Sequence, residues 1–194
     1  MPVSGLQPVL ARGRLKRKPA LRYAVCMMDV PLRRFAPTDM QWLAARHQDL
    51  YAREAGFDET FGPLVADILH SFCAGHDPAC ERGWMAESGG ERLGTVFCMK
   101  KDAATAQLRL FLLTPAARGK GLGKRLLREC MEFARAAGYR GMMLKTHESH
   151  QTACALYRAF GWQLTDSHPV HSYGQDLVEQ TWRLSFPEPE DGAL

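Results

Sequence analysis

The feature that most constrains this chain is a glycine-rich turn between an apolar strand and an amphipathic helix. The turn reads Arg-Gly-Lys-Gly-Leu-Gly over residues 118–123, after a predicted strand at 107–113. Between Gly121 and Ala137 apolar residues recur at helical spacing, which predicts a helix with one buried face. Successive N–H groups at a helix N-terminus bind anions, and the helix dipole favours negative charge there. The turn therefore predicts a diphosphate site.

Other phosphate-binding motifs fit this turn less well. A dinucleotide-binding fold needs Gly-x-Gly-x-x-Gly in its first strand-to-helix turn, whereas this turn follows several predicted strands and has a different glycine spacing. The Gly-x-x-x-x-Gly-Lys-[Ser/Thr] pattern of a P-loop is absent. From the glycine spacing alone, a flexible basic turn is as good an interpretation as a phosphate site. The pattern of the surrounding sequence has to distinguish the two.

The surrounding pattern predicts one α/β domain of the α+β kind. Strands are expected at 30–35, 83–88, 93–100, 107–113, 141–146, 162–166 and 180–186, and helices at 39–54, 63–73, 121–137 and 151–160. Thr38 or Asp39 is expected to cap the first helix. The stretch between the last two strands is expected to be an irregular loop. The strand, helix and strand over 107–146 predict a crossover within a mixed sheet.

Three segments carry a resemblance to a known family. The run Arg118 to Gly123 resembles the R-x-x-G-x-G/A motif with which the GNAT N-acetyltransferase superfamily binds acetyl-CoA. Residues 153–162 resemble the family's A-x-x-L-Y-x-x-x-G-F run, with Trp162 in place of Phe, and residues 32–39 its first strand and helix entry. More narrowly, residues 171–182 resemble the end of acetyltransferase domains fused behind winged-helix regulators, although residues 1–28 are too short to form such a regulator.

The resemblance, which spans about 30–186, implies the GNAT fold, with a mixed sheet of about seven strands flanked by about four helices. It implies acetyl-CoA as co-substrate, and the cofactor-binding residues it implies are Leu112, Leu113, Arg118, Gly119, Lys120, Gly121, Leu122, Gly123, Lys124 and His150. Tyr157 matches the family's tyrosine beside the cofactor sulfur and is the implied catalytic proton donor. Both residues also have purely structural interpretations. Tyr157 could be a core residue of its helix, and His150 could only form hydrogen bonds with the backbone at the start of that helix.

The implied reaction is acetyl transfer to a primary amine by direct attack on the thioester. The stretches that would contact the acceptor contain the carboxylates Glu54, Asp58, Glu59 and Asp176. These carboxylates favour a small cationic amine as acceptor, although they are explained equally well as solvated surface charge. The general base stays open among five carboxylates and a water chain, the carboxylates being Glu54, Asp58, Glu87, Glu148 and Asp176. The alternative function is an acetyl-CoA-binding regulatory module with weak or no turnover, whose basic tail could associate with nucleic acid.

Charge is unevenly placed along the chain, whose net charge is +4. Residues 1–34 carry eight Arg or Lys against one Asp, so residues 1–28 are expected to be a basic extension, 29–187 the acetyltransferase domain and 188–194 an acidic tail. A basic run of this kind is more often a solvated tail than a nucleic-acid contact. A transit sequence and a start-site extension remain open alternatives.

Composition narrows the class further. The six cysteines form no C-x-x-C pair, so reduced thiols in a cytoplasmic protein are expected rather than disulfides or a zinc site. The pairs His147/His150 and His168/His171 lack partners at zinc spacing, and no metal is expected. No apolar run approaches the roughly 20 residues of a membrane span, so no membrane partner is expected. A homodimer is compatible with the sequence, which does not test it.

Overall fold

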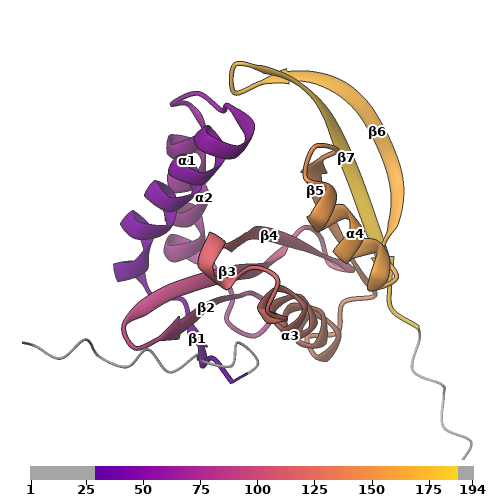
Figure 1. Ribbon diagram of the computed structural model, residues 1–194. Coiled ribbons are helices and arrows are strands. Elements are labelled where there is room, and N and C mark those ends of the chain that lie inside the picture. The colour runs from indigo at the N-terminus through magenta and orange to yellow at the C-terminus, as the bar shows by residue number, and fades with distance from the viewer. Residues whose placement is uncertain (1–28, 188–194) are drawn as a thin grey trace, which may run out of the picture.

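The computed structural model describes residues 29–187 (Figure 1). The predicted basic extension at 1–28 and the acidic tail at 188–194 lie outside the described residues. The strands are β1 (Leu32–Arg34), β2 (Arg82–Ser88), β3 (Glu91–Lys100), β4 (Thr105–Leu113), β5 (Gly141–His147), β6 (Gln163–Ser172) and β7 (Gln175–Ser185). The helices are α1 (Met40–Ala55), α2 (Phe61–Gly75), α3 (Leu122–Ala136) and α4 (Gln151–Ala159), with short 3-10 turns η1 (Pro37–Asp39) and η2 (Pro115–Ala117) before α1 and α3.

All seven strands of the described region form one sheet in the order β1-β2-β3-β4-β5-β7-β6. The pairing of β4 with β5 is parallel, while the other neighbours are antiparallel. This confirms the predicted mixed sheet of seven strands with four helices. The order of strands and helices along the chain also follows the prediction.

The centre of the sheet opens where β4 leaves β5. These strands pair over only three positions, Thr105–Gln107 with Gly141–Met143. Beyond them β4 contains a bulge, because the register with β3 shifts by one residue between Thr95 and Phe97. Leu110, within that bulge, has the positive φ of +48° that bulky residues rarely adopt. The bulge redirects β4, and its backbone edge facing β5 is left without a strand partner.

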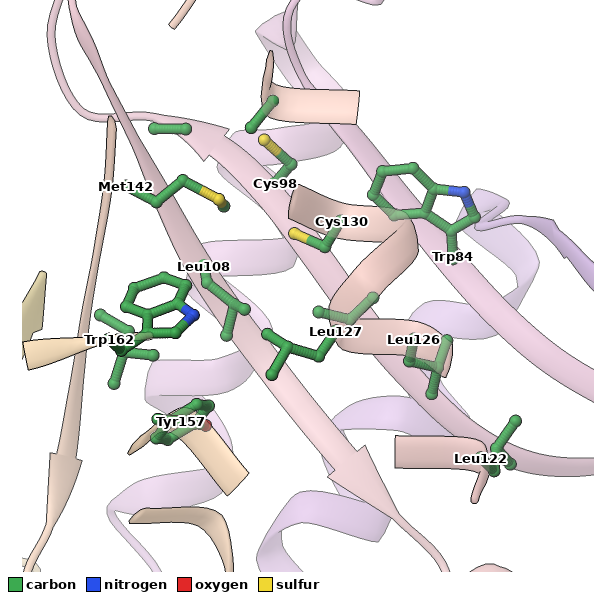
Figure 2. Packing of buried hydrophobic residues seen from close by; sticks show 14 of the residues in the cluster. Trp84, Cys98, Leu108, Leu122, Leu126, Leu127, Cys130, Met142, Tyr157 and Trp162 are labelled. Carbon is green, nitrogen blue, oxygen red and sulfur yellow. The ribbon is translucent and has the colours of Figure 1, made fainter. Parts of the chain in front are cut away.

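Helices cover both faces of the sheet. On one face α3 and α4 bury their apolar stripes, and Figure 2 shows Leu126, Leu127 and Cys130 of α3 beside Cys98 of β3 and Leu108 of β4. On the other face α1 and α2 pack over β3 through a second cluster, whose buried members are Leu43, Val65, Leu69, Phe72 and Phe97. The two clusters pack against β4 from opposite faces of the sheet. They therefore fix the position of β4 where it separates from β5.

The expected irregular loop between the last two strands is wrong, because β6 and β7 form one continuous hairpin. Its two-residue turn, Tyr173–Gly174, has positive φ at both positions, +54° and +70°, as in a type I′ turn. The sequence concealed the hairpin because β6 is an edge strand exposed along most of its length, which removes the alternation of apolar and polar residues. Pro169 also reads as a strand breaker but is tolerated at an edge.

The turn of this hairpin reaches the connection between α1 and α2 (Figure 1). The backbone N–H of Asp58 donates to the carbonyl oxygen of Tyr173 at 3.0 Å, and Gln175 Nε2 donates to the carbonyl oxygen of Gly56 at 3.0 Å. The rings of Phe57 and Tyr173 stack with 4.8 Å between their centroids. Two segments far apart in sequence are therefore joined above the opening in the sheet.

The start of α1 differs from the sequence prediction in the role of Asp39. No side chain caps this helix, and the Asp39 carboxylate, 1% exposed, instead accepts hydrogen bonds from two guanidinium groups. Arg33 donates at 2.6 and 2.8 Å and Arg92 at 2.8 Å. Burial alone would raise the pKa of Asp39, but these hydrogen bonds, with one from the Ala36 N–H, lower its pKa to about 2. The carboxylate therefore ties β1, β3 and α1 together.

We expect Asp39→Asn to lower the free energy of unfolding by about 2–4 kcal/mol, because it leaves two arginines without their shared anion. The matched control Glu87→Gln, at a carboxylate 29% exposed that pairs with the same Arg33, should cost less than about 1 kcal/mol. Urea titration at pH 7 measures both.

The cost of Asp39→Asn should shrink as the pH falls from 3.8 toward 2. The ionised carboxylate stabilises the folded state fully above its unfolded pKa, and this contribution is lost as wild-type Asp39 gains a proton. Equal stability of the wild type and Asp39→Asn at pH 7 would contradict the assigned role.

Candidate active site

The glycine-rich turn presents a row of unpartnered backbone donors at the start of α3. The N–H groups of six successive residues, 119–124, form no hydrogen bond within residues 29–187, and the first helical bond runs from Arg125 N–H to the Gly121 carbonyl at 3.2 Å. Gly119 and Gly121 have φ of +71° and +86°, which residues other than glycine rarely adopt. No acidic side chain lies in the first turn of α3. The arrangement suits a diphosphate.

The three basic residues that the sequence assigns to the diphosphate site lie within or next to this row. Arg118 Nη1 donates to Glu54 Oε1 at 2.8 Å, and its Nε donates to the carbonyl oxygen of Leu113 at 3.2 Å. Lys120 Nζ donates to the Ala116 carbonyl at 2.7 Å, and Lys124 is exposed. The Arg118–Glu54 pair is about half exposed on both sides, so it contributes little stability and an anion can displace it.

Gly123 sets how closely α3 approaches β4. A Cβ atom at this position would lie 3.0 Å from Leu113 Cδ1, closer than packing normally allows. Leu112 and Leu113 belong to the part of β4 that has already left β5, and Leu112 is buried. The first turn of α3 and the free backbone edge of β4 therefore lie side by side.

Tyr157 is buried on α4, at 4% exposure, next to this edge. Its ring lies 6.3 Å from Phe111 of β4 and 5.9 Å from Trp162, and Figure 2 shows Tyr157 and Trp162 at the same end of the apolar cluster. The hydroxyl donates to no described residue. Burial, reinforced by Tyr51, raises the pKa of Tyr157 well above its ordinary value. The phenol is therefore protonated at pH 7.

His150 stands at the entry to α4 and faces Tyr51 of α1, with 5.2 Å between the ring centroids. Its Nδ1 lies 3.3 Å from Thr146 Oγ1. Burial, assisted by neighbouring His147, lowers the pKa of His150 to about 4, while burial and Glu54 raise the pKa of Tyr51 to about 12. Both groups are therefore uncharged at pH 7. Tyr51 was missed because an aromatic residue on an amphipathic helix carries no functional signal in the sequence.

An aromatic cluster lines the side of the opening that faces away from α3. Phe57 and Phe61 lie 5.1 Å apart between ring centroids, and both contact Tyr173 at the hairpin turn. The ring of His147 lies 5.5 Å from Phe57, and its buried Nδ1 has no partner in the described structure. Burial lowers the pKa of His147 as well. Sequence reasoning missed this cluster because its members come from three separate segments.

The carboxylates considered as general base lie mostly away from Tyr157. Glu87 joins the Arg33 and Asp39 network, and Asp176 is almost fully exposed and contacts His171 at 2.7 Å. Asp58 accepts from the Thr60 N–H, and Glu148 is exposed. Only Glu54, paired with Arg118, borders the glycine-rich turn. In residues 29–187 no group of three His, Cys, Asp or Glu side chains is arranged to hold a metal ion.

A separate hollow of about 430 Å³ opens beside α1. Its walls come from α1, the start of β3 and the residues before the glycine-rich turn, among them Trp42, Arg46, Arg92 and Thr114. None of the residues predicted for the acetyl-CoA site lines it. No helix of the described region is both long and apolar enough to cross a membrane.

Solved structures share this fold. A phosphinothricin acetyltransferase of the GNAT superfamily from Sinorhizobium meliloti aligns with a TM-score of 0.69 at 21% identity, covering 84% of this chain and 92% of that one. A ribosomal-protein-alanine N-acetyltransferase from Brucella melitensis aligns with a TM-score of 0.66 at 18% identity, covering 81% and 100%. At these identities the likeness establishes the acetyltransferase fold.

Sequence comparison supplies the family. The model of the acetyltransferase (GNAT) family matches residues 40–162. N-acetyltransferase 8F1 of Rattus norvegicus is 35% identical over 130 residues, covering 64% of this chain and 57% of that protein. N-acetyltransferase 8 of Mus musculus is 41% identical over 106 residues, covering 52% and 45%. The chain spans about half the length of these curated relatives, and it belongs to the acetyltransferase (GNAT) family.

We expect Gly121→Glu to reduce acetyl-CoA affinity at least about 100-fold, because it adds a carboxylate where the N–H row would bind diphosphate. The matched control is Gly138→Glu at the other end of α3, where φ is +87° and a Cβ meets nothing within 4 Å. Glutamate at a positive φ should lower the free energy of unfolding by about 1–2 kcal/mol in both variants. A difference in acetyl-CoA affinity between them therefore does not come from backbone strain.

Calorimetric titration with acetyl-CoA measures the affinities, and circular dichroism checks that both variants fold. A folded Gly121→Glu protein with wild-type affinity would show that the N–H row is not the phosphate site. Equal loss of affinity in Gly138→Glu would assign the effect to stability instead.

Proposed function

We propose that residues 29–187 transfer an acetyl group from acetyl-CoA to a primary amine by direct attack of the amine on the thioester. The observation that carries the proposal is the row of six unpartnered N–H groups at the start of α3, beside the free edge of β4. The Sinorhizobium meliloti structure of the same fold is a complex with acetyl-CoA, which supports the same ligand here. Acetyl-CoA would supply the acetyl group as an activated thioester.

The residues present fit such a co-substrate on three counts. The N–H groups of residues 119–124 would bind the diphosphate, with Arg118, Lys120 and Lys124 adding positive charge. The free backbone groups near Leu112 and Leu113 would bind the amide groups of the pantetheine arm, as a neighbouring strand otherwise would. His150, neutral and at the entry to α4, would donate or accept a hydrogen bond along the same arm.

Tyr157 is proposed as the proton donor to the departing thiolate. Its hydroxyl holds a proton at pH 7 and has no described partner that would compete for it. A buried site destabilises the charged form of a thiol as it destabilises that of a phenol. The low-polarity surroundings that raise the pKa of Tyr157 therefore also favour protonation of the sulfur. Tyr157 would therefore act late, when the sulfur gains charge, and would not contribute to binding.

The acceptor amine has to lose a proton before or during attack. The rings of His147 and His150 are neutral at pH 7, since burial lowers the pKa of both, and each retains a nitrogen lone pair that can accept a proton. His147 Nδ1 is buried without a described partner, so this atom is available for an ordered water. We propose that deprotonation runs through these imidazoles and water rather than through a carboxylate in direct contact.

A panel of amines tests the function. Free thiol released from acetyl-CoA is measured with polyamines, amino acids, simple alkylamines and peptides as acceptors, each compared with the thiol released without acceptor. We expect at least one class to raise thiol release well above that background. Calorimetric binding of acetyl-CoA without turnover of any amine would instead favour an acetyl-CoA-binding regulatory module.

We expect Tyr157→Phe to reduce kcat on the best amine by roughly 100-fold while leaving acetyl-CoA affinity near the wild-type value, as for a lost general acid. The matched control is Tyr139→Phe, at a second buried tyrosine that lies beyond the far end of α3. Steady-state kinetics and calorimetry measure the two variants. Wild-type turnover by Tyr157→Phe would make Tyr157 a core residue.

A further inference from the structure

Arg109 is a charged residue within the central strand that the proposed mechanism does not use. It lies in β4 between Leu108 and Leu110, directly opposite Phe97 of β3. Opposed residues of antiparallel strands project from the same face of a sheet, and Phe97 packs against α1 and α2. Leu108, one position earlier, packs on the α3 side. Arg109 is therefore on the α1–α2 face, two residues beyond the last β4–β5 pair.

The guanidinium group of Arg109 has no counter-ion in the described structure. It forms no hydrogen bond or ion pair with any residue in 29–187, although the side chain is half-buried. Burial lowers its pKa, and among residues 29–187 only the phenol of Tyr173 raises it. Glu179, the carboxylate that raises the pKa of Tyr173, already accepts from Lys145 at 2.6 Å. A partly desolvated cation without an anion is costly, which points to a ligand that supplies one.

The surroundings of Arg109 place that ligand on the acceptor side. The hairpin turn that carries Tyr173 also contacts Phe57 and Phe61, so the phenol that acts electrostatically on the guanidinium belongs to the aromatic cluster. The glycine-rich turn, where diphosphate would bind, lies beyond the C-terminal end of β4 and has its own cations. Arg109 is thus separated from the diphosphate site by the bulge at Leu110, and it borders the apolar wall of the opening.

We infer that Arg109 binds a carboxylate of the acceptor, so that the acceptor is an amine that also carries a carboxylate, with an apolar body against Phe57, Phe61 and Tyr173. An α-amino acid with an apolar side chain meets all three conditions. This inference rests on the proposed acetyl transfer and names the acceptor class for it. A planar guanidinium can bind a carboxylate through two parallel hydrogen bonds, which would fix the position of the amine.

The same observations disfavour the small polycation expected from the sequence. Glu54 is paired with Arg118, Asp58 accepts from Thr60, Asp176 is almost fully exposed, and Glu59 is exposed. None of these carboxylates balances Arg109. A polyamine would bring positive charge to an unneutralised guanidinium, and like charges in a partly desolvated site repel each other.

Matched acceptors test the inference. L-Phenylalanine and phenethylamine share the ring and the amine and differ only in the carboxylate. We expect wild-type kcat/KM to favour L-phenylalanine by at least about 100-fold. Arg109→Gln should reduce kcat/KM for L-phenylalanine by about 100-fold, mainly through KM, and change that for phenethylamine less than about threefold. Arg109→Lys should recover part of the loss, because it restores charge without the planar fork. Arg183→Gln, at an exposed arginine of β7, is the control and should behave as wild type.

A binding measurement keeps this test separate from that of the proposed function. N-acetyl-L-phenylalanine is titrated into the CoA-loaded protein, where binding that Arg109→Gln abolishes supports the carboxylate site even without turnover. Equal kcat/KM for the two acceptors, or equal effects of Arg109→Gln on both, would overturn the inference while acetyl transfer stands. No binding of the N-acetyl compound to the wild type, together with no preference for the carboxylate, would also overturn it.

Discussion

Beyond Gln107, β4 has no hydrogen-bonded neighbour on the side of β5, although both strands continue through the middle of the sheet. Backbone groups in the interior of a protein have to be paired, and a strand edge opened here would be costly without a ligand to complete it. The bulge at Leu110 turns β4 away, and clusters on the two faces hold it there. The row of N–H groups, Tyr157 and Arg109 are all placed by this one separation.

The parts of the fold with strong local signals could be predicted from sequence. The α3 helix was found because its apolar stripe and glycine-rich start are both local, and the β2–β3 hairpin because its strands are buried. The long β6–β7 hairpin was missed because β6 buries almost nothing. Asp39 was assigned a capping role because composition cannot reveal that Arg92, 53 residues away, binds it.

The same contrast applies to the site. The predicted cofactor residues lie on one continuous segment or beside it, so a motif could suggest them. The proposed acceptor side assembles from α1, the α1–α2 connection, β4 and the hairpin turn, and no spacing rule connects Tyr51, Arg109 and Tyr173. Arg109 alone carried a signal, as the one charge in the apolar run Leu108 to Leu113. Its interpretation needed the face of the sheet on which Arg109 lies, which only the pairing with Phe97 gives.

The row of N–H groups at the start of α3 belongs to the main chain, which every residue carries. Over evolutionary time a main-chain site tolerates side-chain drift, provided that the glycines keep the turn in its left-handed conformation. The opposite wall consists of side chains, each open to replacement by a single codon change. Descendants of one ancestral gene can thus inherit the same donor unchanged while they acquire new acceptors, and duplicated copies can diverge without passing through an inactive intermediate.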